Sequence, residues 1–317
     1  MSSNEDAPDE DVRDAVDRAQ SGAPAAGAAV RDRFSADEIF QRVVASADEE
    51  VTSHTRELLL SGLAAGFAIT ITFLAHAAAT ALYPNNDLLA AVLYPIGFVY
   101  IVMGRYQLYT ENTLPPIALV LTRLASLPLL LRVWGVVLAG NLLGGALGVF
   151  VLAQTQVLSP EAAQAAAEFG RKGIATGWWT LFFKALFAGW IVAGLVWLDH
   201  ASRDTITRFF TIYLAFYAIS ALELYHVVVT ACDAMYLLFT GSAGVVPSVL
   251  GFWLPVLLGN TIGGVFLVAL VNYGQTDERR FAERGGRGQE LSTREWLVGR
   301  RAGRSHVPVV GDRRGSQ

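Results

Sequence analysis

Residues 134–145 read WGVVLAGNLLGG, and residues 253–264 read WLPVLLGNTIGG, so the chain repeats itself at a constant offset of 119 residues. The tryptophan, the asparagine with its preceding glycine, and the final glycine pair are in register. A weaker match places LAAGF at residues 63–67 against LFAGW at residues 186–190. The chain is therefore predicted to contain two related halves.

The repeated segments lie in a region that is almost free of charge. The whole chain has 317 residues, of which 53% are hydrophobic and 16% are charged, against roughly a quarter charged in an average soluble protein. Residues 58–273 carry eight acidic and eight basic side chains. This middle region is therefore predicted to lie in a membrane. The composition does not fit a disordered chain or a nucleic-acid binder, and the single cysteine, Cys232, allows no intrachain disulfide.

Six apolar stretches are long enough to cross a bilayer. The second and fifth are too long for one straight crossing and contain polar interruptions. Each repeat holds three stretches, an odd number, so the two copies must have opposite orientations in the membrane. We expect an all-α bundle of six helices with inverted 3+3 repeats and broken second and fifth helices. The stretches lie at residues 58–82, 88–121, 128–153, 177–198, 206–239 and 250–273.

The ends of the chain are expected to be aqueous. Residues 1–33 belong to an acidic segment without an apolar run and are predicted to be disordered. Residues 34–57 begin with Ser35 and Glu38 in capping-box spacing, which predicts a short interfacial or cytoplasmic helix. Residues 274–317 form an arginine-rich tail that either touches anionic lipid or remains solvated. The tail includes arginine pairs at 279–280, 300–301 and 313–314.

The short loops predict the orientation. Basic residues concentrate in the loops on the side of the two tails, which favours cytoplasmic termini in a multi-pass protein of the plasma membrane. The opposite loops contain only Arg171 and Lys172. The basic residues on the tail side are Arg123, Arg132, Arg203 and Arg208.

Two ionisable residues inside the stretches are candidates for function, because polar groups deep in a membrane are costly. Lys184 has apolar residues on both sides in the fourth stretch. The alternative for it is a lysine that reaches the membrane surface. His226 coincides with the expected break of the fifth stretch and can exchange protons near neutral pH.

The second stretch contains a matching interruption. Residues 104–116 read GRYQLYTENTLPP and combine two charges with consecutive prolines, so they cannot form one apolar helix. We expect a re-entrant loop, because residues 88–103 are too few to cross at full length. Asn141 and Asn260 lie among glycines in the repeated motif, and their amides are expected to hold the broken helices by hydrogen bonds.

A resemblance to a known family follows from these motifs. The segment YPIGF at residues 94–98, with GRYQLYTEN at residues 104–112, resembles the second-helix motif of formate/nitrite transporters, whose usual form ends in a Leu-Phe-Thr-Gly-Asn type loop. Lys184, His226 and LGNTIGG at residues 258–264 follow in the family's order. The resemblance extends over about residues 34–273.

The resemblance implies an aquaporin-like protomer in a homopentamer, with one pore in each protomer. Family members conduct small monovalent anions of weak acids, such as formate, nitrite or hydrosulfide. Tyr94, Leu108 and Tyr109 would line constrictions, Thr110 would form a hydrogen bond in the broken second helix, and His226 would face it as the central pore residue.

These residues suggest a mechanism without a cofactor. A bare anion loses hydration in a narrow apolar pore at a cost of several kcal/mol. Lys184 would attract the anion, and His226 would donate or relay a proton so that the neutral acid crosses. Arg105 and Glu111 depart from the familiar loop pattern, and residues 227–231 read VVVTA instead of Ser-Val-Ala-Asn-Met. These departures leave the substrate open.

Other classes remain as alternatives. A neutral-solute channel of the same architecture would not need Lys184. A membrane enzyme is a weaker alternative, because GSAG at residues 241–244 resembles a serine-protease fragment only superficially and no metal-ligand spacing such as His-x-x-x-His occurs. A membrane scaffold would leave both Lys184 and His226 without a role.

Overall fold

The computed structural model describes residues 34–275 and 291–299. These residues form helices and connecting segments, without a strand. The acidic segment 1–33 and the arginine pairs at 279–280, 300–301 and 313–314, for which the sequence predicts disorder or lipid contact, lie outside the described residues.

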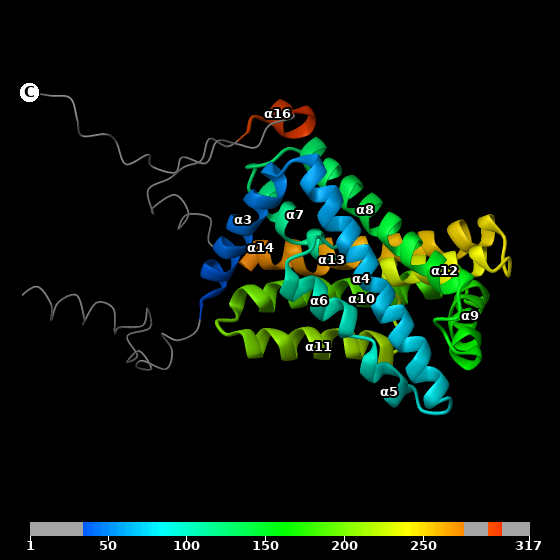
Figure 1. Cartoon of the computed structure of the whole chain (residues 1–317). Helices are drawn as coiled ribbons and strands as arrows, with labels where there is room; N and C mark the ends of the chain where they lie inside the picture. Colours follow the sequence, from blue (N-terminus) through cyan, green and yellow to red (C-terminus); the bar gives the residue numbers. More distant parts are fainter. Residues whose placement is uncertain (1–33, 276–290, 300–317) are drawn as a thin grey trace, which may run out of the picture.

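The first half of the described chain runs from helix α3 to helix α9 (Figure 1). Its elements are α3 (Ala36–Thr52), α4 (Thr55–Leu82), α5 (Asp87–Ala90), η1 (Ala91–Leu93), α6 (Ile96–Gly104), η2 (Glu111–Thr113), α7 (Pro115–Leu121), α8 (Leu127–Gln154) and α9 (Pro160–Ala175).

The second half of the described chain begins with another long helix. Its elements are α10 (Trp178–Ala201), α11 (Thr205–Ala221), α12 (Val227–Phe239), η3 (Pro247–Trp253), α13 (Leu254–Gly264), η4 (Val265–Leu270), α14 (Val271–Gln275) and the C-terminal α16 (Thr293–Val298).

Four segments within the described residues are long and apolar enough to cross a membrane, which fits a multi-pass membrane protein. They are α4, the run from α5 through α6, α8 and α10. The shorter apolar helices α11 and α12 follow each other with only residues 222–226 between them. Residues 105–114 separate α6 from α7 in the same way, with only the short η2 inside them.

Glycines bring the long helices into close contact in pairs. Helix α4 packs along α8, and α10 packs along α13 (Figure 1). A Cβ atom on Gly66 would overlap the backbone carbonyl of Asn141, and one on Gly189 would overlap that of Asn260. These glycines are the two that the weaker sequence repeat aligns. Small residues at helix contacts allow such approach of two backbones.

Helix α3 covers one end of this bundle. Its N-terminus has a capping box, in which the Ser35 hydroxyl accepts from the Glu38 backbone N–H at 3.3 Å and the Glu38 carboxylate accepts from the Ser35 N–H at 2.8 Å. The apolar face of the helix, including Phe40 and Val43, is buried against the bundle. At the same end, the indole of Trp296 in α16 donates to the backbone carbonyl of Val120 at 2.8 Å. We refer to this part of the molecule as the α3 end.

Left-handed backbone conformations end the shorter helices in matching positions. Arg105 follows α6 with φ 58°, and Glu223 lies two residues after the end of α11 with φ 53°. Arg123 lies two residues after α7 with φ 57°, and Gly241 lies two residues after α12 with φ 67°. Both pairs are 118 residues apart. Three of these four residues are not glycine, although a side chain makes this conformation costly.

Candidate functional site

The first chain interruption is held by one amide. The Asn141 side chain, which is fully buried in α8, accepts a hydrogen bond from the Tyr109 backbone N–H at 2.9 Å. Its amide nitrogen donates to the carbonyls of Gly62 at 2.8 Å and Gln107 at 2.9 Å. The bonds to Tyr109 and Gln107 satisfy backbone groups that residues 105–114 cannot pair within a helix, and the bond to Gly62 joins α8 to α4.

The second interruption has the same arrangement. Asn260 in α13 accepts from the Val227 backbone N–H at 2.8 Å. Its amide nitrogen donates to the carbonyls of Ala185 at 2.7 Å and Tyr225 at 2.9 Å. The two asparagines therefore make equivalent sets of three bonds, each joining one long helix to the interrupted segment of its own half.

The two interruptions meet at His226 and Thr110. The His226 Nε2 atom lies 2.8 Å from the Thr110 hydroxyl oxygen, and both side chains are 1% exposed. The imidazole packs edge-on against Phe98, with ring centres 4.9 Å apart, and against Phe216 at 6.1 Å. Its Nδ1 atom has no hydrogen-bond partner among the described residues. One titratable ring, set among aromatic side chains, thus joins the two halves.

The other side chains predicted from the resemblance are buried and have partners of their own. Leu108, at offset 118 from His226, is fully buried. The Tyr109 hydroxyl lies 2.8 Å from the Thr261 hydroxyl. The Tyr94 ring packs edge-on against His76 at 5.2 Å and lies 5.6 Å from Phe98. Their predicted role in constrictions stays a prediction.

Lys184 is not joined to His226 by any hydrogen bond; it belongs to a charge cluster at the end of the bundle that carries α9. Its Nζ atom lies 3.4 Å from one carboxylate oxygen of Glu223. The other oxygen lies 2.6 Å from Lys172 Nζ. The hydrogen bond to Glu223 raises the pKa of Lys172, which keeps this ammonium charged. The Lys184 ammonium also lies 6.0 Å from the centre of the Tyr225 ring.

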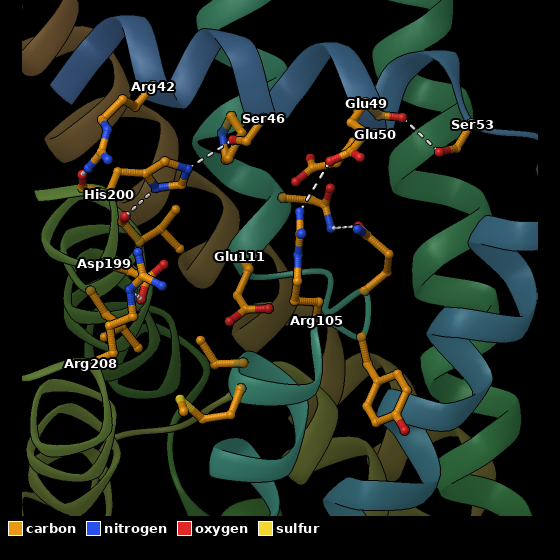
Figure 2. A pocket seen from close by; sticks show the side chains of 18 of the residues that line it. Arg42, Ser46, Glu49, Glu50, Ser53, Arg105, Glu111, Asp199, His200 and Arg208 are labelled. Atoms are coloured by element: carbon orange, nitrogen blue, oxygen red, sulfur yellow. Dashed lines mark hydrogen bonds and ion pairs between the residues drawn. The ribbon is translucent and has the colours of Figure 1, made fainter. Parts of the chain in front are cut away.

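A large polar pocket opens at the α3 end (Figure 2). Its volume is about 860 Å³, and residues of α3, α6, the first interruption and the facing ends of α10 and α11 line it. Arg105 pairs with Glu49 at 3.1 Å, and Arg208 pairs with Asp199 at 3.4 Å. Its charged lining consists of four acidic side chains and three arginines, with His200 beside them. These are Glu49, Glu50, Glu111, Asp199, Arg42, Arg105 and Arg208.

Two carboxylates of this pocket lack such partners. One oxygen of Glu50 is buried without a hydrogen-bond partner among the described residues. Burial, followed by the neighbouring Glu49 carboxylate, raises the pKa of Glu50 to about 8, although Arg105 acts in the opposite direction. Glu111 points into the pocket from the first interruption (Figure 2) and has no ion pair within the part of the chain that the structure describes.

Sequence reasoning missed several of these acids. Glu223 and Asp233 lie inside the fifth apolar stretch, where an acidic residue is a signal in itself. Glu50 lies before the first apolar stretch, and no sequence signal singles it out. Asp233 is 7% exposed and lies in α12, the helix for which His226 is the N-terminal cap residue. It has no hydrogen bond or ion pair to any other described side chain. Across the described ranges, no group of three or more histidine, cysteine or acidic side chains is arranged to hold a metal ion.

Comparison with known proteins identifies the family. A family model described as formate/nitrite transporter matches residues 37–274. The chain belongs to the formate/nitrite transporter family. The chain is 29% identical over 242 residues to the inner membrane protein YfdC of Escherichia coli K12, a match that covers 75% of this chain and 77% of YfdC. It is also 27% identical over 205 residues to a probable formate transporter of Methanothermobacter thermautotrophicus, a match that covers 59% of this chain and 75% of that transporter.

Solved structures share the fold of this formate/nitrite transporter family member. A pentameric formate channel with formate bound superposes with a TM-score of 0.60 at 19% identity, covering 69% of this chain and 96% of the channel. An ion channel of the same family superposes with a TM-score of 0.64 at 17% identity, covering 75% and 99%. Membership of a family of transporters and channels makes this chain a membrane transport protein and not an enzyme.

Proposed function

We propose that the protein conducts small monovalent anions of weak acids, such as formate or nitrite, and that a proton accompanies the anion through the pore. The observation that carries the proposal is the contact between His226 and Thr110, because it places one titratable side chain where the two interrupted helices meet. The name of the related formate channel and the family match support the substrate class.

The proposed architecture is an aquaporin-like protomer of six crossings. The interrupted pairs α6–α7 and α11–α12 would each count as one crossing, in two halves of opposite orientation. The matching bonds of Asn141 and Asn260 support this relationship. The protein would lie in the plasma membrane with both termini in the cytoplasm. Lipid would surround its apolar outer faces. The pentameric form of the related channel supports a homopentamer.

In the proposed mechanism, Lys184 attracts the anion to the end of the pore that carries α9. The anion then meets His226, whose Nδ1 atom has no partner among the described residues and can exchange a proton with substrate or water. Protonation of the anion removes the charge that makes an apolar passage costly. Tyr94, Leu108 and Tyr109 would form the narrow parts on either side.

Flux through proteoliposomes tests this function. Reconstituted protein is assayed with formate, nitrite, hydrosulfide, acetate and a neutral solute over a series of pH values. We expect anion flux that rises as the pH falls, and a His226→Asn variant, which cannot titrate in this range, should lose that dependence. An unchanged pH profile in His226→Asn, with the variant still folded, would contradict the role of the histidine.

A neutral-solute channel is the second candidate. The carboxylates that line the α3-end pocket favour it, because Glu50 and Glu111 would repel anions when ionised. The ion pair between Lys184 and Glu223 also offsets one positive charge at the other end. Flux of the neutral solute in the same assay separates the two candidates. If anions are the substrate, Lys184→Ala should reduce anion flux and leave the flux of the neutral solute unchanged.

A further inference from the structure

The cluster at the α9 end has an unusual geometry for a surface ion pair. Three elements contribute one side chain each: Lys172 from α9, Lys184 from α10 and Glu223 from the segment between α11 and α12. Each lysine contacts a different oxygen of the same carboxylate, at 2.6 Å and 3.4 Å. The two ammonium groups therefore lie on the two sides of one two-oxygen anion.

A carboxylate held in this way shows what the two lysines can bind. Charge-assisted hydrogen bonds to both oxygens of a carboxylate are stronger and more directional than a single contact. Formate and nitrite also present two equivalent oxygens on one central atom. The carboxylate of Glu223 thus occupies the position that such an anion would take between Lys172 and Lys184.

The cluster is open to exchange with solutes. The side chains of Lys172, Glu223 and Lys184 are 56%, 42% and 33% exposed. Two positive charges and one negative charge leave a net charge of +1, so the cluster still attracts an anion while Glu223 is bound. Ion pairs with this degree of exposure are weak enough to open and close readily.

The backbone holds Glu223 in a position where its carboxylate can compete with an anion for the two lysines. Its left-handed turn is closed by the Glu223 N–H bond to the Ser220 carbonyl and the Leu224 N–H bond to the Ile219 carbonyl, both 2.9 Å. A group held by a short turn acts at a high effective concentration. The same segment continues directly into His226, so Glu223 and the histidine belong to one stretch of five residues, 222–226.

We propose that Lys172 and Lys184 form an entry site for two-oxygen monovalent anions, and that Glu223 is a built-in competitor that the incoming anion must displace. The inference rests on the proposed anion transport and adds to it a second lysine and a residue that sets the affinity. Removing the competitor strengthens binding of the substrate, whereas removing Lys172 weakens it.

The test compares formate binding and flux in Glu223→Gln with the wild type. The Gln variant keeps the size of the side chain and removes its charge. We expect the half-saturation concentration for formate flux in proteoliposomes to fall by about two- to fivefold, the range that corresponds to releasing partly exposed ion pairs. The fall should be smaller for chloride, which has no second oxygen to contact the other lysine.

A matched control comes from the same end of the molecule. Glu168 pairs with Arg171 at 3.0 Å on α9, one turn from Lys172, and neither lysine contacts it. Glu168→Gln removes the same charge and should leave the half-saturation concentration unchanged. If the half-saturation concentration falls equally in both variants, the effect comes from the general loss of negative charge, and the proposed entry site is wrong. An unchanged value in Glu223→Gln, or an equal change for formate and chloride, would also overturn it.

Two further measurements keep the inference testable. If Glu223→Gln does not yield folded protein, Lys172→Gln takes its place, and its half-saturation concentration should rise by about two- to fivefold; an unchanged value would reject the entry site. If the wild type shows no anion flux, the proposed function fails. Calorimetric titration of the purified protein with formate then decides the inference separately, with tighter binding expected in Glu223→Gln and equal binding contradicting it.

Discussion

The imidazole Nε2 atom of His226 lies 2.8 Å from the hydroxyl oxygen of Thr110, although 116 residues separate them in the chain. Each residue belongs to the interrupted segment of one half of the molecule. The bond therefore ties together the two segments that lack regular helical hydrogen bonding, and both side chains are buried.

Thr110→Val should break this bond without changing the shape of the side chain. A buried group left without its partner costs about 1–3 kcal/mol, so we expect a lower melting temperature and an altered pH dependence of flux. Thr110→Ser keeps the hydroxyl and should resemble the wild type in both respects. Thermal unfolding in detergent and proteoliposome flux measure the two effects. Equal behaviour of the Val and Ser variants would refute a role for the bond.

Asn141→Ala and Asn260→Ala should destabilise the protein to a similar degree. Each removes three hydrogen bonds to backbone groups, two buried and one partly buried, and the expected cost is about 3 kcal/mol or more. Gln154→Ala, which removes one exposed bond to the Phe239 carbonyl, serves as the control and should have little effect. The melting temperatures of the three variants are compared. A lower melting temperature in only one of the two asparagine variants would argue against equivalent roles.

Gly66→Ala should disturb the contact between α4 and α8. The added methyl group would overlap the Asn141 backbone, and overpacking of this kind costs about 1–3 kcal/mol or more. The same change at Gly135 in α8 meets no other atoms, so Gly135→Ala should stabilise the helix by about 0.5–1 kcal/mol. The melting temperature should fall in Gly66→Ala and rise in Gly135→Ala. An unchanged melting temperature in Gly66→Ala would show that the helices can separate at little cost.

Glu50 should make stability depend on pH. Because burial raises its pKa from 4.5 to about 8, the folded protein holds this proton more tightly than the unfolded chain does. Stability from this group is therefore present below about pH 4.5 and is lost as the pH rises towards 8. In Glu50→Gln, the melting temperature should fall less over this window than in the wild type. Asp48→Asn, on the same helix, is the control, and parallel curves for wild type and Glu50→Gln would contradict the expectation.

The sequence by itself determined the features that depend on local composition. Apolar stretches without charge predict membrane helices, and the capping-box spacing predicts where α3 begins. The charges and prolines of residues 104–116 predict an interruption. In the structure, α6 ends at Gly104 and α7 begins at Pro115. The family resemblance followed from motifs of the same local kind, and the family match confirms it.

The tertiary structure decided which distant side chains meet. Lys184 was expected to attract an anion on its own, yet it shares Glu223 with Lys172, a residue 12 positions earlier in another helix. Arg105 and Glu223 both adopt left-handed conformations that their residue types do not predict. Such pairings depend on how helices pack across the bundle, and the packing of distant helices cannot be inferred from local sequence. For that reason the sequence could single out Lys184 but not the Glu223 carboxylate that contacts it.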